Sequence, residues 1–260
     1  SKQLDSGTLK PRPNFIRNFP AMTSIIPLSE ANSLEEFVKL VELLPLLQGD
    51  SIYRGQAVKG NLIPGVSRNN RRENTTALER ETLNQLSLRG ANLLNSPLQS
   101  TLDLMVIAQH SGLKTRLLDW TSNPLAALWF ACADHIEGDA YVYALGKEQL
   151  LVSDMYSSDP FAQCKTRVFQ PRQNNLRIVA QQGWFTLHSY SSENNEFIPL
   201  ELQGMMENHT LFEITIPEKS RENMTRSLDR YGMNLWTLFP DLEGLCRHLT
   251  WKHHPDNTDK

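Results

Sequence analysis

The sequence predicts an α+β fold in which helices surround a strongly bent mixed sheet. Helical and strand-like segments alternate too irregularly for a doubly wound parallel sheet, and the strand-like segments concentrate in the second half of the chain. Near the middle, an apolar helix follows a polar turn. The 260 residues, 40% hydrophobic and 21% charged, are enough for one large domain.

Three parts are expected along the chain. Residues 1–30 form an irregular arm, because proline lacks the backbone donor that helices and inner strands need. The prolines of this arm are Pro11, Pro13, Pro20 and Pro27. Residues 31–250 form a single domain, and residues 251–260 form a polar tail that frays.

The elements follow from periodicity and from their end signals. Helices are expected at 33–44, 76–95, 100–110, 124–133, 221–231 and 239–249. Strands are expected at 51–56, 117–120, 139–145, 177–180, 184–188 and 211–216. Capping boxes at Ser33–Glu36 and Thr76–Glu79 begin the first two helices. The remaining long segment, 147–175, is expected to be an ordered loop with a short helix.

Composition excludes several classes of protein. The net charge of −3 does not favour a large nucleic-acid footprint, and three cysteines without a CxxC pair favour neither disulfides nor a metal site. No apolar run is long enough to span a bilayer and no secretory signal is visible, so a cytoplasmic protein without a membrane partner is expected. The P-loop, Rossmann, zincin and GxSxG motifs do not occur.

The stretch from Ala108 to Ala133 is the centre of the functional argument. It reads AQHSGLKTRLLDWTSNPLAALWFACA, a short apolar strand with two embedded charges, a polar turn and a buried helix. Asn123 suits the N-cap position and Pro124 the first helical position. A polar turn at a helix N-terminus can bind an anion.

Several polar residues have both a structural and a functional interpretation. Arg54, in the triplet Tyr53-Arg54-Gly55 at a strand end, suits bidentate phosphate binding, although a structural ion pair is the commoner fate of such an arginine. His110 is expected to interact with the C-terminus of its helix, an interpretation that is favoured over a catalytic base. Arg116 and Asp119 are expected to form an internal ion pair.

Two later segments are also ambiguous. In Gln181-Gln182-Gly183-Trp184-Phe185, polar amides precede two aromatic residues, which either stack on a ligand or lie in the core. Asp241 and Glu243 begin the last helix. Either their carboxylates are there because they interact favourably with the helix dipole, or one of them supplies an acid to a cleft.

Together these segments resemble the FRG domain family. The triplet Tyr53-Arg54-Gly55 resembles its name-giving Phe/Tyr-Arg-Gly, and Gln109 to Ala131 resembles the signature QHYGLPTRLLDWTxNPLxALYFA, with Ser111 and Lys114 as departures. The segments RIVAQQGWF at 177–185 and LFPDLEGL at 238–245 also resemble family signatures. The resemblance covers about residues 50–250.

The FRG pattern in turn resembles that of arginine-type ADP-ribosyltransferases, which implies a split, bent sheet and NAD as substrate. The resemblance implies that Arg54 holds the pyrophosphate or ribose, that Asp119 and Thr121 organise the nicotinamide pocket, and that Trp120 stacks on a ring. The implied NAD-binding residues are Tyr53, Arg54, Gly55, His110, Arg116, Trp120, Thr121 and Gln182. The implied catalytic residues are Arg54, Asp119, Thr121, Gln181 and Glu243.

The chain departs from the transferase pattern at its acid. Those enzymes carry a Glu on a later strand, where this sequence has Gln181-Gln182. An amide can donate a hydrogen bond to ribose but supplies neither charge nor base. Three alternatives follow. Gln181 takes the role of the transferase glutamate, Asp241 or Glu243 supplies the acid, or the domain binds a nucleotide without catalysis.

The leading hypothesis is therefore transfer of ADP-ribose from NAD to a protein, RNA or DNA, or hydrolysis of NAD, in a toxin or phage-defence role with a regulatory partner such as an antitoxin. A second is a non-catalytic nucleotide or nucleic-acid binding module, using a basic loop and the aromatic pair Trp184-Phe185. The basic residues are Arg68, Arg71 and Arg72. A third is an interaction domain in which Arg54, Arg116 and Asp119 form only a structural network.

Overall fold

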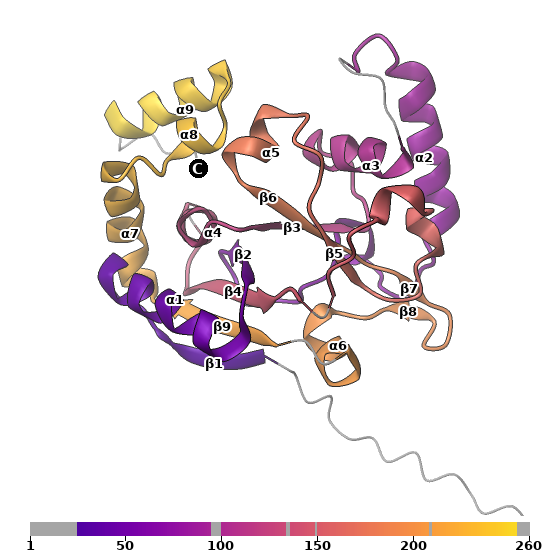
Figure 1. Cartoon of the computed structure of the whole chain (residues 1–260). Helices are drawn as coiled ribbons and strands as arrows, with labels where there is room; N and C mark the ends of the chain where they lie inside the picture. Colours follow the sequence, from indigo (N-terminus) through magenta and orange to yellow (C-terminus); the bar gives the residue numbers. More distant parts are fainter. Residues whose placement is uncertain (1–24, 95–99, 134–135, 149, 208–209, 254–260) are drawn as a thin grey trace, which may run out of the picture.

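A computed structural model describes residues 25–94, 100–133, 136–148, 150–207 and 210–253 (Figure 1). Its strands are β1 Ile25–Glu30, β2 Ser51–Gln56, β3 Leu117–Thr121, β4 Ala140–Gly146, β5 Arg167–Phe169, β6 Gly183–Leu187, β7 Tyr190–Ser191, β8 Glu196–Phe197 and β9 Leu211–Ile216. Its helices are α1 Leu34–Gln48, α2 Thr76–Arg89, α3 Thr101–His110, α4 Pro124–Cys132, α5 Leu176–Ala180, α6 Leu200–Glu207, α7 Glu218–Arg230, α8 Leu235–Leu238 and α9 Leu242–His253. The α+β class is confirmed.

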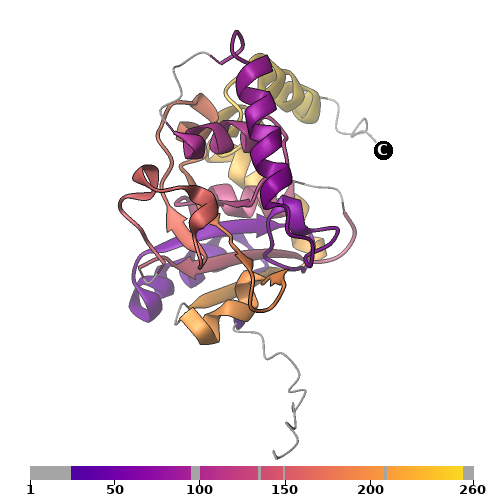
Figure 2. The same cartoon turned by 90° about the vertical axis from the view of Figure 1, so that its right-hand side faces the viewer.

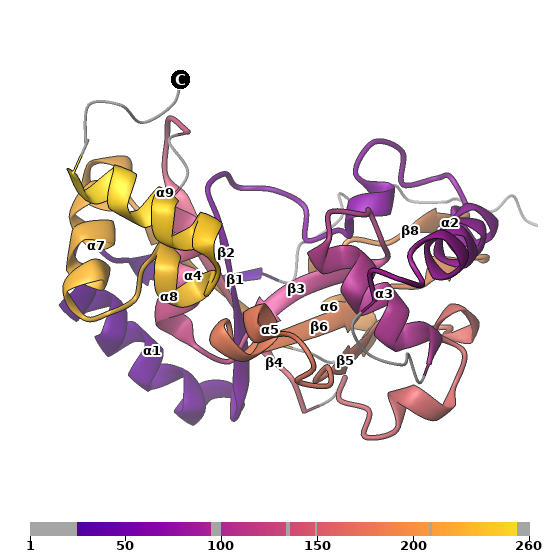
Figure 3. The same ribbon diagram turned by 90° about the horizontal axis from the view of Figure 1, so that it is seen from above.

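Seven strands form one mixed sheet in the order β1-β9-β4-β2-β3-β6-β5. Strand β1 runs parallel to β9 and the other neighbours are antiparallel. The sheet is weakly joined at one place, because β2 pairs with β3 only through Tyr53 and Thr121. Seen from above, α1, α4, α7, α8 and α9 lie on one side of β2, and α2 and α3 lie on the other (Figure 3).

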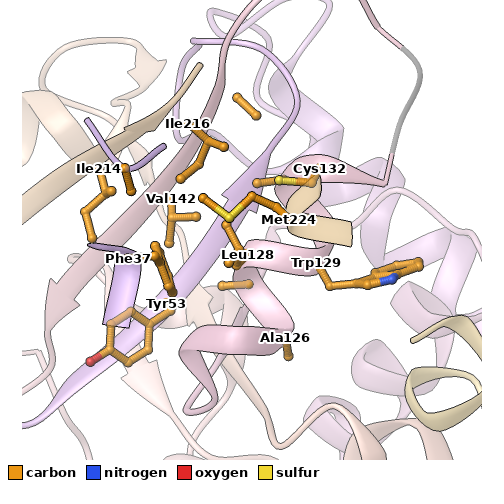
Figure 4. Close-up of a cluster of buried hydrophobic side chains, with 14 of the residues drawn as sticks. Phe37, Tyr53, Ala126, Leu128, Trp129, Cys132, Val142, Ile214, Ile216 and Met224 are labelled. Atoms are coloured by element: carbon orange, nitrogen blue, oxygen red, sulfur yellow. The ribbon is translucent and has the colours of Figure 1, made fainter. Parts of the chain in front are cut away.

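Helix α4 packs directly on β2. The side chain of Asn123 accepts hydrogen bonds from the backbone N–H groups of Leu125 and Ala126, which confirms the predicted N-cap. The helix buries Ala127 and Leu128 in a cluster with residues of α1, β4, β9 and α7 (Figure 4). A Cβ atom on Gly55 would lie 1.9 Å from the carbonyl oxygen of Ala127, so the glycine permits this close approach.

We expect Gly55→Ala to destabilise the fold. The methyl group would collide with the α4 backbone, which cannot rotate away, so the loss should lie near the upper end of the roughly 1–3 kcal/mol typical of overpacking. Urea denaturation measures it. Gly60→Ala is the matched control, because no atom lies within 4 Å of its added Cβ. Equal midpoints for the two variants would contradict the tight packing of α4 on β2.

The other half of the sheet is covered by α2 and α3. Leu83 of α2 and Met105 of α3 are buried in a second cluster with Phe169 of β5 and Phe185 of β6. In the side view α2, in purple, stands in front of this half (Figure 2). A third cluster, which includes Ile52, Trp120 and Trp184, fills the opposite face of the sheet.

Residues 25–30 are a strand, so the prediction of an irregular arm over 1–30 is wrong for this part; residues 1–24 lie outside the described residues. The strand β1 is held by pairing with β9, a partner nearly 190 residues away in sequence. Pro27 is tolerated because β1 is an edge strand whose register shifts between Pro27 and Ser29.

Residues 177–180, predicted as a strand, belong to helix α5, because the side chain of Asn175 accepts from the N–H of Arg177 and caps a helical turn. The second helix ends at Arg89 rather than near 95, and its N-cap is Thr75 rather than Thr76. The predicted final helix, 239–249, corresponds to α9, which begins at Leu242 and continues to His253, beyond the predicted start of the tail. The short helix α8, which precedes it, was not predicted. Strands β5, β7 and β8 and helix α6 were not predicted.

Across the described ranges, no helix combines the length and the apolar character that crossing a membrane requires.

Candidate functional site

A cavity of about 600 Å³ opens where β2 and β3 separate, a volume in the range of small-molecule sites. Its polar lining comprises Arg54, Gln56, Asn61, Arg68, Gln109, His110, Asp119, Thr121, Arg177 and Gln181. Its other lining residues include Tyr53, Gly55, Ala57, Val58, Trp120, Ala127, Phe130, Ile136 and Phe239. Segments from both halves of the sheet therefore meet at the predicted site.

Arg54 reaches across the gap between the separating strands. Its Nη1 donates to the carbonyl oxygen of Asp119 at 2.8 Å, and its Nε donates to Oε1 of Gln56 at 2.9 Å. Neither acceptor is a carboxylate, and within the described residues no ion pair involves Arg54, so the structural ion-pair interpretation is wrong. Burial lowers the pKa of the Arg54 guanidinium to about 10, which leaves it charged at neutral pH.

Three arginines line the cavity. Arg54 and Arg68 come from the segment that includes β2, and Arg177 comes from α5. Arg177 is paired with Asp241, whose Oδ2 lies 2.7 Å from its Nη2. This pairing and the Gly244 N–H, which donates to Oδ1, lower the pKa of the Asp241 carboxyl. The excess of guanidinium groups favours an anionic ligand.

Asp119 is the one carboxylate among the described residues that line the cavity. Alternation along β3 explains its direction, because Asp119 and Thr121 share a face with Leu117, which packs toward α3. Gln109 at the end of α3 donates from Nε2 to Oδ2 of Asp119 at 2.9 Å. Thr115 donates to Oε1 of Gln109 at 2.8 Å, and this orients the Gln109 amide. The carboxylate is thus held in place from α3.

Arg116 is not part of the cavity, and its predicted ion pair with Asp119 is wrong. Its guanidinium pairs with Glu79 of α2, at 2.9 Å from Nη2 to Oε1, and only 1% of its side chain is exposed. Its backbone N–H also donates to Oε2 of Glu79. Glu79 therefore serves a buried ion pair and not the predicted capping box. The resemblance-based assignment of Arg116 to NAD binding is not supported by this position.

The turn before β6 meets the turn after β3. Thr121 donates from Oγ1 to the carbonyl oxygen of Gln181 at 2.6 Å and accepts from the N–H of Asn123 at 2.9 Å. Gln181 is the C-cap of α5, and Gln182 has a positive φ of 48°, so neither lies on a strand as predicted. The Gln181 amide lines the cavity and donates to the carbonyl of Leu238 at 3.1 Å. Gln182 does not line the cavity and its side chain is exposed.

The aromatic residues expected to stack on a ligand are mostly in the core. Trp120 is 4% exposed and donates from Nε1 to Thr186, because alternation along β3 turns it to the face opposite Asp119. Trp184 and Phe185 are also buried, which supports the core alternative and removes the stacking surface. Phe130 and Phe239, which were not predicted, also line the cavity.

Two further predicted residues occupy other positions. Glu243 is exposed in the first turn of α9 and does not line the cavity, so its assignment as the acid is not supported. Tyr53 lines the cavity and is 7% exposed, packed against α4. Of the basic loop, Arg68 lines the cavity, whereas Arg71 pairs with Glu196 at 2.9 Å.

Sequence reasoning missed Gln109, Arg177 and Phe239 as site residues. All three lie inside the segments that carry the family resemblance, at 109–131, 177–185 and 238–245. Their positions inside those segments could have identified them as candidate site residues from the sequence.

The family comparison finds the FRG domain model at residues 49–140. This range contains β2, α2, α3, β3 and α4 and ends at the first residue of β4. It therefore includes Arg54, His110, Asp119 and Thr121. No curated protein and no solved structure matches the chain. The similarity to the FRG domain family therefore extends over residues 49–140 of the chain.

Proposed function

We propose that this FRG domain binds NAD in the cavity between β2 and β3 and transfers its ADP-ribose to a macromolecule or to water. The observation that carries the proposal is Arg54, whose guanidinium bridges the split of the sheet and lines the cavity. Two of its nitrogens are oriented by Gln56 and Asp119, and no described residue accepts a hydrogen bond from Nη2. Nη2 can therefore donate to a phosphate oxygen.

The lining suits the two ends of NAD. Arg54 and Arg68 would hold the pyrophosphate, because both are cationic and line the same cavity. Phe130 and Phe239, whose ring centroids are 6.1 Å apart, supply an apolar wall for a heteroaromatic ring. This pair takes the stacking role that the resemblance assigned to Trp120.

Asp119 is the group best placed to stabilise positive charge. As nicotinamide leaves, positive charge develops on the ribose, and a fixed carboxylate nearby lowers the energy of that transition state. Asp241 is paired with Arg177, and Glu243 lies outside the cavity. The hydrogen bond from Gln109 fixes the Asp119 carboxylate before the reaction. Thr121, whose Oγ1 joins the two turns, would maintain the floor of the pocket.

A toxin or phage-defence effector acting in the cytoplasm, kept inactive by a regulatory partner, is the setting that we propose for this activity. The acceptor of ADP-ribose would be a protein, RNA or DNA. The FRG resemblance supports this setting.

The test is incubation of the protein with NAD labelled in its adenosine and with cell extract, followed by measurement of labelled macromolecules, free ADP-ribose and released nicotinamide. We expect nicotinamide release together with one of the two labelled products. Intact NAD after prolonged incubation, with no label on macromolecules, would refute the enzymatic proposal.

A second candidate is a nucleotide-binding module without catalysis, which the arginine-rich lining favours. A thermal-shift panel with NAD, ADP-ribose, ATP and oligonucleotides separates the two, since a ligand that binds the native state raises its stability by RT ln(1 + [L]/Kd). Stabilisation by ATP or oligonucleotides, with no nicotinamide release, would favour the module.

A further inference from the structure

His110 presents an unused ring nitrogen at the cavity. It is the last residue of α3 and lines the cavity, and its Nε2 is buried without a hydrogen-bond partner among the described residues. Burying a nitrogen in this way is unfavourable unless a partner arrives. The orphaned Nε2 therefore points to a ligand group that completes it.

A helix-capping role does not account for this histidine. The carbonyl oxygens of Ile107, Ala108 and Gln109 accept hydrogen bonds from backbone N–H groups of the following residues, Ser111, Leu113 and Gly112, at 2.9–3.1 Å. These three carbonyl oxygens of the last turn of α3 therefore have backbone donors, so an imidazole is not required to cap them. The predicted interaction of His110 with the helix terminus is not the reason for its position.

The ring packs edge-on against Phe185, and its surroundings favour its neutral form. Its centroid lies 5.8 Å from that of Phe185, with the planes at 80°, in an edge contact from β6. The charged groups that act on it are Asp119 of β3, which raises its pKa, and Arg177 of α5, which lowers it. Burial is the largest influence, and the pKa of His110 lies below its usual value. At pH 7 the imidazole can therefore accept a proton.

We propose that His110 is a catalytic residue whose Nε2 takes the proton of an O–H nucleophile, either a macromolecular hydroxyl or water. This inference rests on the proposed function. The glycosidic C1′–N bond breaks and its electron pair returns to nicotinamide, which leaves neutral. The nucleophile oxygen forms the new C1′–O bond, and its proton passes to Nε2, which becomes the cationic imidazolium and later releases it to solvent.

Asp119 and His110 have different roles in this reaction because they carry different charges. Asp119 stabilises the positive ribose, and the positive charge that forms on His110 is itself favoured by Asp119. A chain that has Gln181-Gln182 where the transferases carry a glutamate can in this way separate charge stabilisation from proton removal. A carboxylate acceptor carries no proton and would gain nothing from His110, so the inference selects hydroxyl groups or water.

The experiment compares wild type, His110→Gln and the control His253→Gln, whose exposed histidine lies at the end of α9. Single-turnover rates of nicotinamide release and of ADP-ribose appearance, free or on macromolecules, are measured from pH 5 to 8. We expect His110→Gln to lower product formation by roughly 100-fold or more, as for loss of a general base. The Kd for NAD, obtained from the shift in Tm that NAD produces, should change by less than about twofold.

The pH profile distinguishes proton removal from a structural role. The wild-type rate should fall as the pH drops through a pKa below the usual histidine value near 6.5, because imidazolium cannot accept a proton. This acidic limb should persist in His253→Gln and be absent from His110→Gln. In a His110→Ala variant, added imidazole should restore part of the rate, which keeps the test decisive if the glutamine variant folds poorly.

Two outcomes would overturn the role of His110 while leaving the transferase proposal standing. The first is that His110→Gln keeps the wild-type rate and its acidic limb. The second is that His110→Ala binds NAD but is not rescued by imidazole. A wild-type protein that neither binds nor cleaves NAD would overturn both. The two failures are therefore distinguishable.

Discussion

Arg54→Ala is expected to lower NAD-dependent transfer by roughly 100-fold, because a hydrogen bond to a charged group contributes about 1.5–3 kcal/mol and 1.4 kcal/mol is tenfold. The guanidinium spans the gap between β2 and β3, where the two strands pair only through Tyr53 and Thr121. Arg54→Lys should also lose most of the activity, since lysine cannot contact Gln56, the Asp119 carbonyl and a phosphate at once. Single-turnover rates and the NAD-induced shift in Tm measure the loss.

Arg89→Ala is the matched control, because this arginine is exposed at the end of α2 and does not line the cavity. It should bind NAD as wild type does. The stability of Arg54→Ala should fall by only about 1 kcal/mol, since water entering the open cavity can replace the lost donors. An Arg54→Ala protein that keeps the wild-type rate would rule out the proposed site.

Breaking the Arg116–Glu79 pair is expected to lower the free energy of unfolding by about 3–5 kcal/mol, because it leaves an uncompensated buried charge. The two side chains are 1% and 5% exposed. Glu79 accepts from the Arg116 backbone N–H, from its Nε and Nη2 and from the Thr75 hydroxyl. Glu79→Ala would remove all of these acceptors at once. Urea denaturation is the measurement.

The double variant Arg116→Met, Glu79→Leu should lose clearly less stability than the sum of the single variants, because no charge remains unpaired. The exposed pair Arg226–Glu222 is the control, with side chains 57% and 76% exposed. Arg226→Ala should change the stability by no more than about 0.5 kcal/mol. A Glu79→Ala variant within about 1 kcal/mol of wild type would show that the buried pair is not a major determinant of stability.

Local sequence determined much of the fold and part of the site. Asn123 and Pro124 encode the start of α4 through one hydrogen-bond acceptor and one missing donor, and short apolar segments encode β2, β3, β4 and β9. These signals act over a few residues, so they can be recognised without knowledge of the rest of the chain. The sequence placed Asp119 in a short strand and Thr121 in the turn after it; in the structure both belong to β3 and both line the cavity.

Only the tertiary structure determined which residues the polar and aromatic side chains contact. Arg116 and Asp119 are three residues apart, so strand alternation turns their side chains to opposite faces. Arg116 therefore pairs with Glu79 of α2, whereas Asp119 accepts a hydrogen bond from Gln109 of α3. Trp120 faces the core for the same reason, and Pro27 joins a strand only because β9 lies beside it. The orphaned nitrogen of His110 likewise depends on what surrounds it. Such choices depend on contacts between distant segments, whose geometry no local pattern contains.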